Sequence, residues 1–161
     1  MARVLVTGMS GAGKTTLSDE LQRRGHLTAD TDYDDWQLPD STWDEPRLHQ
    51  FLVSNPAVIV SGTAENQGRF YDQFEHVVLL SAPLDVLVER LATRTNNPYG
   101  KTAEQRARVA RYVDTVEPLL RRGATLELDG RRPTSELADV AERLLVRTPW
   151  SAEEESGFSW R

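Results

Sequence analysis

The feature that most limits how this chain can fold is the stretch Val4–Leu17, VLVTGMSGAGKTTL, which places an apolar run directly before a glycine-rich loop. Within it, Gly8–Thr15 matches the spacing G-x-x-x-x-G-K-[S/T]. Glycines let backbone amides turn inward, and the N-terminus of a following helix adds partial positive charge. The loop is therefore predicted to hold phosphate groups between a strand and a helix.

Two residues at the end of this loop indicate what the phosphates belong to. Lys14 is placed to reach the β and γ phosphates of a nucleotide, and the hydroxyl of Thr15 is a ligand for Mg²⁺. A glycine turn that binds nothing is the alternative, but it leaves Lys14 without a role. The sequence therefore predicts ATP and Mg²⁺ as cofactors. The residues expected to bind the nucleotide in this loop are Gly8, Met9, Ser10, Gly11, Ala12, Gly13, Lys14, Thr15 and Thr16.

Length and composition limit the architecture and the class of the protein. A chain of 161 residues suffices for one hydrophobic core, so we expect one domain over residues 1–147 and an acidic, aromatic tail over 148–161. Cysteine is absent, which removes disulfides and Cys-based metal sites. No stretch approaches the roughly 20 apolar residues of a membrane span. We expect a cytoplasmic protein without a membrane partner, either a monomer or a small homo-oligomer.

The charge of the chain bears on its partners. The net charge of −6 argues against nucleic acid, because proteins that bind it present basic residues to phosphate. Seven acidic residues and no Lys or Arg lie in Asp30–Glu45, whereas Arg90–Arg132 has ten Lys or Arg against five acidic residues. Both segments are explained either as solvated faces or as two flanks of a site, one for cations and one for anions.

Short apolar runs alternate with segments of helical spacing along the chain. Five runs are too short for helices and predict strands at 3–7, 26–29, 57–61, 76–80 and 124–128. Helices are predicted at 14–24, 46–53, 84–92, 102–121 and 135–146, and Thr102 and Gln105 have the spacing of a capping box. This alternation predicts an α/β fold of three layers, a five-stranded parallel sheet with helices on both faces.

Acidic residues follow the second predicted strand in HLTADTDYD. Asp30 and Asp32 are two positions apart at the carboxyl end of that strand, so both side chains point the same way, and this edge of an open α/β sheet is where ligands bind. Beside a phosphate loop, one carboxylate orients Mg²⁺ and the other accepts the proton of an attacking hydroxyl. The alternative is that they are turn or capping residues, which we favour for Asp34 and Asp35.

Over residues 1 to about 147 the chain resembles the small P-loop kinases of the nucleoside-monophosphate, shikimate and gluconate kinase type, an adenylate kinase-like group. The D-T-D of Asp30–Asp32 is similar to the D-x-D of shikimate kinases, which implies that the first aspartate serves the metal and the second the acceptor hydroxyl. LDVLVERLATR has the R-x-x-x-R spacing found where the lid of adenylate kinases begins. That likeness implies that Arg90 lies against the adenine and Arg94 on the phosphates.

Two later stretches extend the resemblance. RVARYVDTVEP, residues 108–118, has Arg, Tyr and Pro at the separations of an adenylate kinase pattern, which implies that Arg108 contacts the γ-phosphate and the charge of the transition state. DGRRP matches the loop that cradles the base in that family, which implies nucleotide contacts from Arg131 and Pro133. A surface charge is the alternative for Arg131. Residues 94–108 correspond to the short lid of the family.

The acceptor side departs from the pattern of nucleotide kinases. AVIVSGTAENQGRF lacks the D-G-x-P-R of adenylate kinases, and residues 26–68 contain a single arginine. Enzymes that phosphorylate nucleotides grip the existing phosphate with several arginines. An acidic and aromatic pocket instead suggests a neutral or cationic acceptor with a hydroxyl, such as a nucleoside, a sugar or an aminated metabolite. For Trp36 and Trp43, core packing is the alternative to stacking on the acceptor. The residues expected at the acceptor are Asp30, Asp32, Trp36, Arg47, Gly62, Glu65 and Asn66.

Together these features predict an enzyme, an ATP-dependent phosphotransferase that moves the γ-phosphate of ATP to a hydroxyl of a small molecule. One alternative is a nucleoside-monophosphate kinase in which Arg47 and Arg69 grip the second phosphate. Another is a P-loop NTPase or nucleotide-binding switch without a small-molecule acceptor. A polynucleotide kinase fits poorly with the acidic acceptor side. The residues expected to be catalytic are Lys14, Asp32, Arg94 and Arg108.

Overall fold

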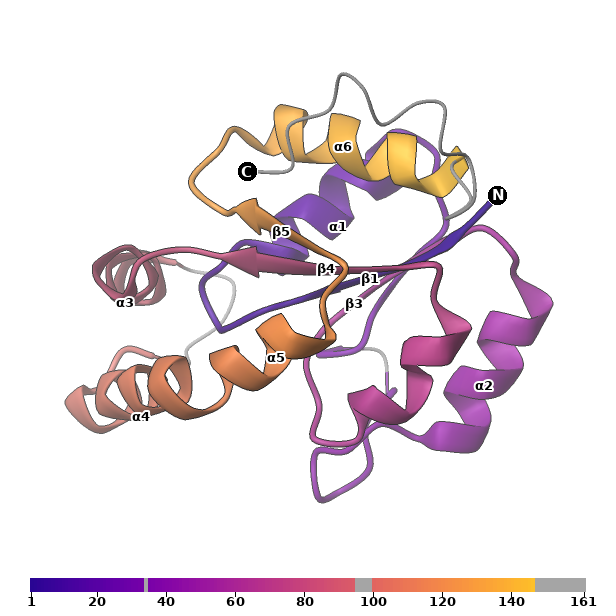
Figure 1. Ribbon diagram of the computed structural model, residues 1–161. Helices are drawn as coiled ribbons and strands as arrows, with labels where there is room; N and C mark the ends of the chain where they lie inside the picture. The colour runs from indigo at the N-terminus through magenta and orange to yellow at the C-terminus, as the bar shows by residue number, and fades with distance from the viewer. Residues whose placement is uncertain (34, 95–99, 147–161) are drawn as a thin grey trace.

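The sheet has the architecture that the sequence predicts. The computed structural model describes residues 1–33, 35–94 and 100–146. All strand pairs in the sheet are parallel, with the order β2-β3-β1-β4-β5. The α/β fold with a five-stranded parallel sheet is therefore confirmed (Figure 1). The strands are β1 (Arg3–Thr7), β2 (Thr28–Asp30), β3 (Val58–Ser61), β4 (His76–Ser81) and β5 (Leu126–Asp129).

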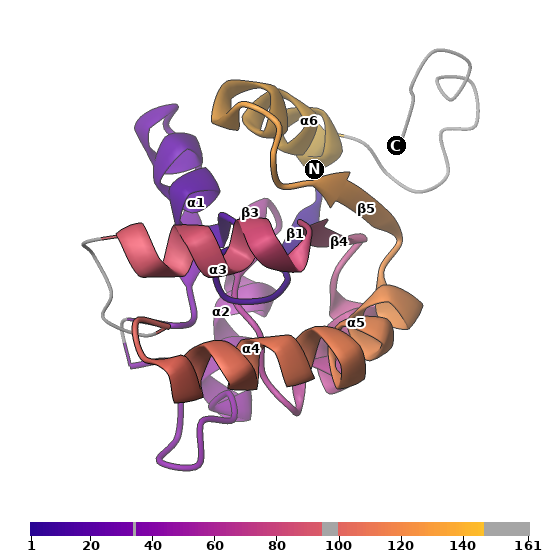
Figure 2. The ribbon, with the colours of Figure 1, turned by 90° about the vertical axis from the view of Figure 1, so that its left-hand side faces the viewer.

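Helices cover both faces of the sheet. In Figure 1, α1 and α6 lie on one face, and α2, the 3-10 helix η1 and α5 lie on the other. The carboxyl ends of the strands point toward α3 and α4, which Figure 2 shows in front of the sheet. The site therefore has a sheet edge as its floor and two helices beyond it. The helices are α1 (Lys14–Arg23), α2 (Glu45–Ser54), η1 (Gln67–Gln73), α3 (Leu84–Thr93), α4 (Ala103–Thr115), α5 (Glu117–Gly123) and α6 (Thr134–Val146).

Alternating strand residues divide the hydrophobic core into two clusters. Val4 and Ile59 point to the face covered by α1 and α6, whereas Leu5 and Val60 point to the face covered by α2. All four are at most 1% exposed. A parallel strand that is buried on both faces has a continuous run of apolar residues in the sequence. The strands were predicted from such runs.

The structure differs from the predicted elements in the fourth helical segment. The predicted helix over 102–121 is two helices, α4 and α5, which meet at Val116. Pro118 has no amide to donate to the carbonyl four residues earlier, so the helix breaks there. The capping box is confirmed, since the Thr102 side chain and the Gln105 side chain each bond the other's backbone amide. The sequence did not predict η1, a 3-10 helix without a helical apolar period.

Some predictions concern residues outside the described part of the chain. These are Asp34, the middle of the expected lid at 95–99, and the expected tail at 148–161. Among the helices of the described residues, none is long and apolar enough to cross a membrane.

The turn after β3 depends on Gly62, so we predict that Gly62→Ala destabilises the fold. Gly62 has φ +141°, and a Cβ there would lie 1.8 Å from Oγ1 of Thr31. Thr31 cannot give way freely, because its hydroxyl donates to the Ser61 carbonyl at 2.8 Å. We expect the free energy of unfolding in urea to fall by about 2 kcal/mol or more.

Gly25→Ala is the matched control for this prediction. Gly25 also has positive φ, +93°, but nothing lies within 4 Å of the added Cβ. Only the backbone conformation is strained there, so we expect a loss of about 1 kcal/mol. Equal losses at the two glycines would show that the contact with Thr31 is unimportant.

Candidate nucleotide and acceptor site

The phosphate loop connects β1 to α1 at the carboxyl edge of the sheet. Gly13 precedes α1 with φ +107°, a conformation that side chains with a Cβ rarely adopt. Gly8 packs so closely on β4 that a Cβ would lie 2.3 Å from the Leu80 carbonyl oxygen. These contacts explain why the loop needs glycine at both ends, and they leave its amides at the start of a helix, where anions bind.

Lys14 lies along the loop with its ammonium group buried. Its Nζ donates to the carbonyl oxygens of Gly8 at 2.7 Å and Met9 at 3.1 Å. Burial lowers the pKa of Lys14, against the opposing effect of the carboxylates of Asp32 and Asp30. The residue is only 8% exposed. The structure therefore places a desolvated cation beside the loop and near two carboxylates.

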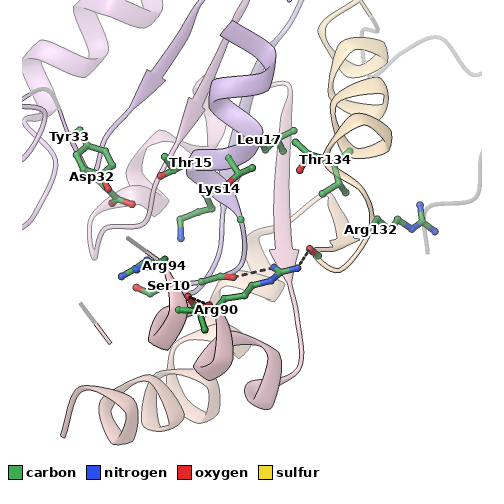
Figure 3. Close-up of a pocket in the computed structure, with 16 residues that line it drawn as sticks. Ser10, Lys14, Thr15, Leu17, Asp32, Tyr33, Arg90, Arg94, Arg132 and Thr134 are labelled. Carbon is green, nitrogen blue, oxygen red and sulfur yellow. Dashed lines mark hydrogen bonds between the residues drawn. The ribbon is translucent and has the colours of Figure 1, made fainter. Parts of the chain in front are cut away.

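The carboxyl end of β2 brings Asp30 against the first turn of α1. The Thr15 hydroxyl donates to Oδ2 of Asp30 at 2.9 Å, and the backbone amide of Asp32 donates to Oδ1 at 3.1 Å. Burial raises the pKa of Asp30, while the bond from Thr15 opposes that rise. The amide bond turns the chain so that Asp32 is exposed and faces the loop across the cavity (Figure 3).

Arg90 joins the phosphate loop to the turn between β5 and α6. Its guanidinium donates to the carbonyls of Gly11 at 3.2 Å, Ala12 at 3.3 Å and Gly130 at 2.8 Å. The turn packs tightly there, since a Cβ on Gly130 would lie 2.5 Å from the Ala12 carbonyl oxygen. The resemblance implied a contact with adenine for Arg90. In the structure it lines the cavity and also fixes two of its walls to each other.

Arg94 is the residue at which α3 ends. It lines the same cavity as Lys14, and its positive charge contributes to lowering the lysine pKa. Lys101 lies just beyond the undescribed segment and donates to the carbonyls of Ala92 and Arg94. Lys101 therefore caps the carboxyl end of α3, where a cation is favoured, and holds the backbone of Arg94.

A cavity of about 430 Å³ brings these groups together (Figure 3). The phosphate loop and the first turn of α1 form one wall, and residues from the turn after β2, from α3 and its end, and from the β5–α6 turn and the start of α6 form the others. Seven of its residues were not named as site residues from the sequence: Leu17, Tyr33, Thr93, Gly130, Arg132, Thr134 and Leu137. Leu17, Tyr33 and Thr93 each lie directly beside a residue that the sequence did assign, but no motif singles them out. The residues of the β5–α6 segment reach the cavity through tertiary contacts.

The β5–α6 turn presents different residues from those predicted. Arg132 and Thr134 line the cavity, whereas Arg131 and Pro133 do not. Arg131 forms a short ion pair with Asp129 on the other side of the turn, at 2.8 Å, which lowers the pKa of that carboxyl to about 2. Pro133 is exposed and its carbonyl accepts amides at the start of α6. Arg131 and Pro133 therefore lie outside the lining of this cavity, and the nucleotide contacts that the resemblance implies for them stay predictions.

The aromatic wall predicted for the acceptor site is part of the core. Trp36 is 8% exposed and packs edge-on against Phe51, with ring centroids 5.0 Å apart. Trp43 is 0% exposed and packs similarly on Phe70, at 5.7 Å. Neither ring lines the cavity, because both fill the space between α2 and the sheet. Tyr33 is the aromatic residue that does line it.

Other predicted acceptor residues have structural contacts. The Asn66 amide bonds both the amide and the carbonyl of Trp43 at 3.0 Å, which holds the segment before α2. Gly62 is buried against Thr31, and Glu65 is exposed outside the cavity lining. The structure thus brings Asp32 to the cavity and gives Asn66 and Gly62 roles in holding the loop after β3.

Arg108 lies on α4, outside the cavity lining. Its side chain is 41% exposed, and its guanidinium is 3.8 Å from Glu104 one turn earlier. The contact with the γ-phosphate that the resemblance implies for Arg108 stays a prediction.

Solved structures with the same fold come from small-molecule kinases. Shikimate kinase from Acinetobacter baumannii, solved in complex with shikimate, has a TM-score of 0.65 and 19% identity, covering 90% of this chain and 91% of that chain. Shikimate kinase from Bacteroides thetaiotaomicron has a TM-score of 0.64 and 20% identity, covering 88% and 95%. A gluconokinase from Sinorhizobium meliloti has a TM-score of 0.56 and 17% identity, covering 89% and 90%. The resemblance to P-loop kinases is confirmed at the level of the fold.

Sequence comparison places the chain in a broader group. A search of curated proteins found no significant match. A family model described as an AAA domain matches residues 4–113, which include the phosphate loop, the D-T-D, Arg90 of α3 and Arg94 directly after it. Because this match spans more than half of the chain, the protein belongs to the AAA domain family.

Proposed function

We propose that the protein is an ATP-dependent phosphotransferase that moves the γ-phosphoryl group of ATP to a hydroxyl of a small molecule. The observation that carries this proposal is the shared cavity, which Lys14, Asp32 and Arg94 line from three different elements. A nucleotide-binding switch also uses a carboxylate for its metal, but here Asp30 bonds Thr15 and fits that role, which leaves Asp32 as a second carboxylate facing the lysine. Shikimate kinase and gluconokinase structures with the same fold support the same class of reaction.

The chemistry assigned to the cavity is a single displacement at phosphorus. The acceptor oxygen bonds to the γ-phosphorus, the bond to the β–γ bridging oxygen breaks, and ADP leaves with that electron pair. The carboxylate of Asp32 takes the proton of the acceptor hydroxyl. Lys14 and Arg94 stabilise the negative charge on the transferring group, which positioned cations do best where water is excluded. Arg108 is proposed to add to this charge from α4.

Thr15 and Asp30 have the donor atoms for Mg²⁺. A hydroxyl and a carboxylate oxygen 2.9 Å apart, beside a phosphate loop, suit a hard cation that prefers oxygen ligands and takes few of them from protein. When bound, Mg²⁺ neutralises phosphate charge during transfer. Among the described residues there is no group of three or more His, Cys, Asp or Glu that could hold a metal ion.

Two arginines bear on the class of acceptor. Arg47 stacks over the Trp36 ring, 4.4 Å from its centroid, and donates to the Asp35 carbonyl. Arg69 lies 3.3 Å from Glu45 in an ion pair. Both cations that a nucleotide acceptor would use are thus engaged elsewhere, and neither lines the cavity. This supports a neutral or cationic acceptor, such as a nucleoside, a sugar or an aminated metabolite.

The direct test is transfer of label from [γ-³²P]ATP and Mg²⁺ to panels of nucleosides, nucleoside monophosphates, sugars and aminated metabolites. We expect label on a neutral or cationic hydroxyl compound, and loss of transfer when EDTA removes the metal. Label on nucleoside monophosphates alone would contradict the acceptor class. ATP hydrolysis without transfer to any acceptor would instead favour the nucleotide-binding switch.

A further inference from the structure

Polar side chains connect the turn after β3 to the first residue of the phosphate loop. Oγ1 of Thr63 lies 2.8 Å from the Gly8 carbonyl oxygen, 3.3 Å from the Gly8 amide nitrogen and 2.9 Å from Oγ1 of Thr7. Thr7, in turn, is bonded to Gln67, and these two residues are 0% and 3% exposed. The Thr63 hydroxyl therefore contacts both backbone polar groups of Gly8, the residue that begins the loop.

The hydrogen bonds of this cluster run in one direction. Oε1 of Gln67 accepts the Ala64 amide at 2.9 Å, which turns Nε2 toward Oγ1 of Thr7 at 3.2 Å. The single hydroxyl proton of Thr63 goes to the Gly8 carbonyl, which can only accept. Thr7 then donates to Thr63, the nearer of its two acceptors, since Oε1 of Gln67 is 3.3 Å away. The hydrogen bonds thus run from Gln67 through the hydroxyls of Thr7 and Thr63 to the carbonyl oxygen of Gly8. Hydrogen bonds linked in one direction strengthen one another.

The Gly8 oxygen also accepts the hydrogen bond from Nζ of Lys14 at 2.7 Å. Nζ has three protons and gives two of them to the carbonyls of Gly8 and Met9. To donate to both the β and the γ phosphates of ATP, as the proposed function requires, it has to release at least one of these carbonyls, and release of the Gly8 oxygen leaves that oxygen without its lysine partner. Gly8 is buried, and a buried carbonyl that loses its partners is unfavourable. After this release the Thr63 hydroxyl still donates to Gly8.

We propose that Thr63 is a positioning residue that keeps the Gly8 carbonyl hydrogen-bonded while Lys14 turns from the loop to the phosphates of ATP. This inference rests on the proposed function, because it assumes that the cavity binds ATP. Without the Thr63 hydroxyl, the movement of Lys14 leaves the buried carbonyl oxygen of Gly8 without a hydrogen bond. The protein should therefore lose affinity only for ligands that draw Lys14 away from Gly8. AMP has only an α-phosphate and does not require that movement.

The test is Thr63→Val, which keeps the branched shape and removes the hydroxyl. Calorimetry gives the dissociation constant of ATP·Mg²⁺, with AMP measured as a competitor of ATP so that both report on one site. We expect about tenfold weaker binding of ATP, the effect of one buried group left unpaired, and unchanged binding of AMP. Thr63→Ser restores the hydroxyl and is expected to restore ATP binding.

Thr125→Val is the matched control. The Thr125 hydroxyl bonds the amide and the carbonyl of Val77 at 2.9 and 3.2 Å, the same double contact that Thr63 makes with Gly8, but at the amino end of β4. This variant is expected to lose thermal stability without changing the ratio of ATP to AMP affinity. A purely structural role of Thr63 would give the same result at both threonines.

A second comparison uses Lys14→Met, in which no ammonium has to move. In the Lys14→Met background, Thr63→Val is expected to leave the ratio of ATP affinity to AMP affinity unchanged, because the effect of losing the Thr63 hydroxyl depends on the movement of Lys14. The inference is overturned if Thr63→Val leaves ATP binding unchanged, or weakens ATP and AMP equally. If the valine variant does not fold, Thr63→Ala takes its place in the same measurements. Failure of the unmodified protein to bind ATP would overturn both the inference and the proposed function.

Discussion

Asp32→Asn is expected to lower kcat by about 10²–10⁴-fold while ATP binding stays close to that of the unmodified protein, because a general base contributes to the chemical step alone. Asparagine keeps the size of the side chain and its backbone amide still bonds Asp30 at 3.1 Å, so the turn is preserved. What the variant loses is the oxygen that takes the proton of the acceptor. Single-turnover transfer from labelled ATP, with calorimetry for ATP binding, measures the two effects separately.

Asp35→Asn is the matched control for this prediction. It removes the same charge three positions later, at an exposed residue with φ +60°, a conformation that asparagine accepts well. We expect normal kcat, which would exclude a general effect of charge in the loop. Near-normal transfer by Asp32→Asn would remove Asp32 from the mechanism, while equal losses in the two variants would point to the loop rather than to the carboxylate.

Lys14→Met is expected to lower kcat/KM for ATP by about 10³-fold, since the ammonium stabilises charge on the β and γ phosphates in the transition state. Methionine is unbranched and similar in length, so it fits the space that the lysine stem occupies. Burial already lowers the lysine pKa, which means that the fold is not held together by this charge. Circular dichroism should show a melting temperature close to that of the unmodified protein.

Lys14→Arg distinguishes the position of the charge from its presence. The ammonium fits between two carbonyls, 2.7 and 3.1 Å away, at a site that is 8% exposed, and the broader guanidinium does not match that geometry. We expect activity nearly as low as for Lys14→Met. Full activity of Lys14→Met would mean that the loop binds phosphate without a cation at this position, whereas full activity of Lys14→Arg would mean that the presence of the charge matters and its exact position does not.

The arrangement of the phosphate loop and the residues around it was predictable, because it depends on residues close together in the sequence. The glycine loop, the lysine and the start of the helix occupy consecutive positions. Asp30 ends β2 and Asp32 lies two positions later, so backbone geometry directs both to the carboxyl edge of the sheet. The arginines of α3 were found through a spacing of four residues on one helix. In each case the distance along the chain is short enough for local geometry to fix the arrangement.

The assignments that differ from the structure depend on side-chain contacts that the motifs do not specify. Trp36 was expected beside the acceptor. In the structure its ring instead packs against Phe51 of α2 and is part of the hydrophobic core. Along the β5–α6 turn, Asp129 holds Arg131 on one side, so Arg132 faces the cavity instead. Neighbouring residues of a turn point in different directions. The spacing of residues within a motif does not determine which of them points into the cavity.

By itself, the sequence determined that this chain folds as a parallel α/β sheet with a phosphate loop after its first strand, because apolar periodicity and glycine spacing act over a few residues. The tertiary structure decided which residues share the cavity with that loop. It joined the loop to the β5–α6 turn through Arg90, and it connected Gly8 to Thr63, 55 positions away. Such contacts depend on how strands pair and helices pack, which no local pattern specifies.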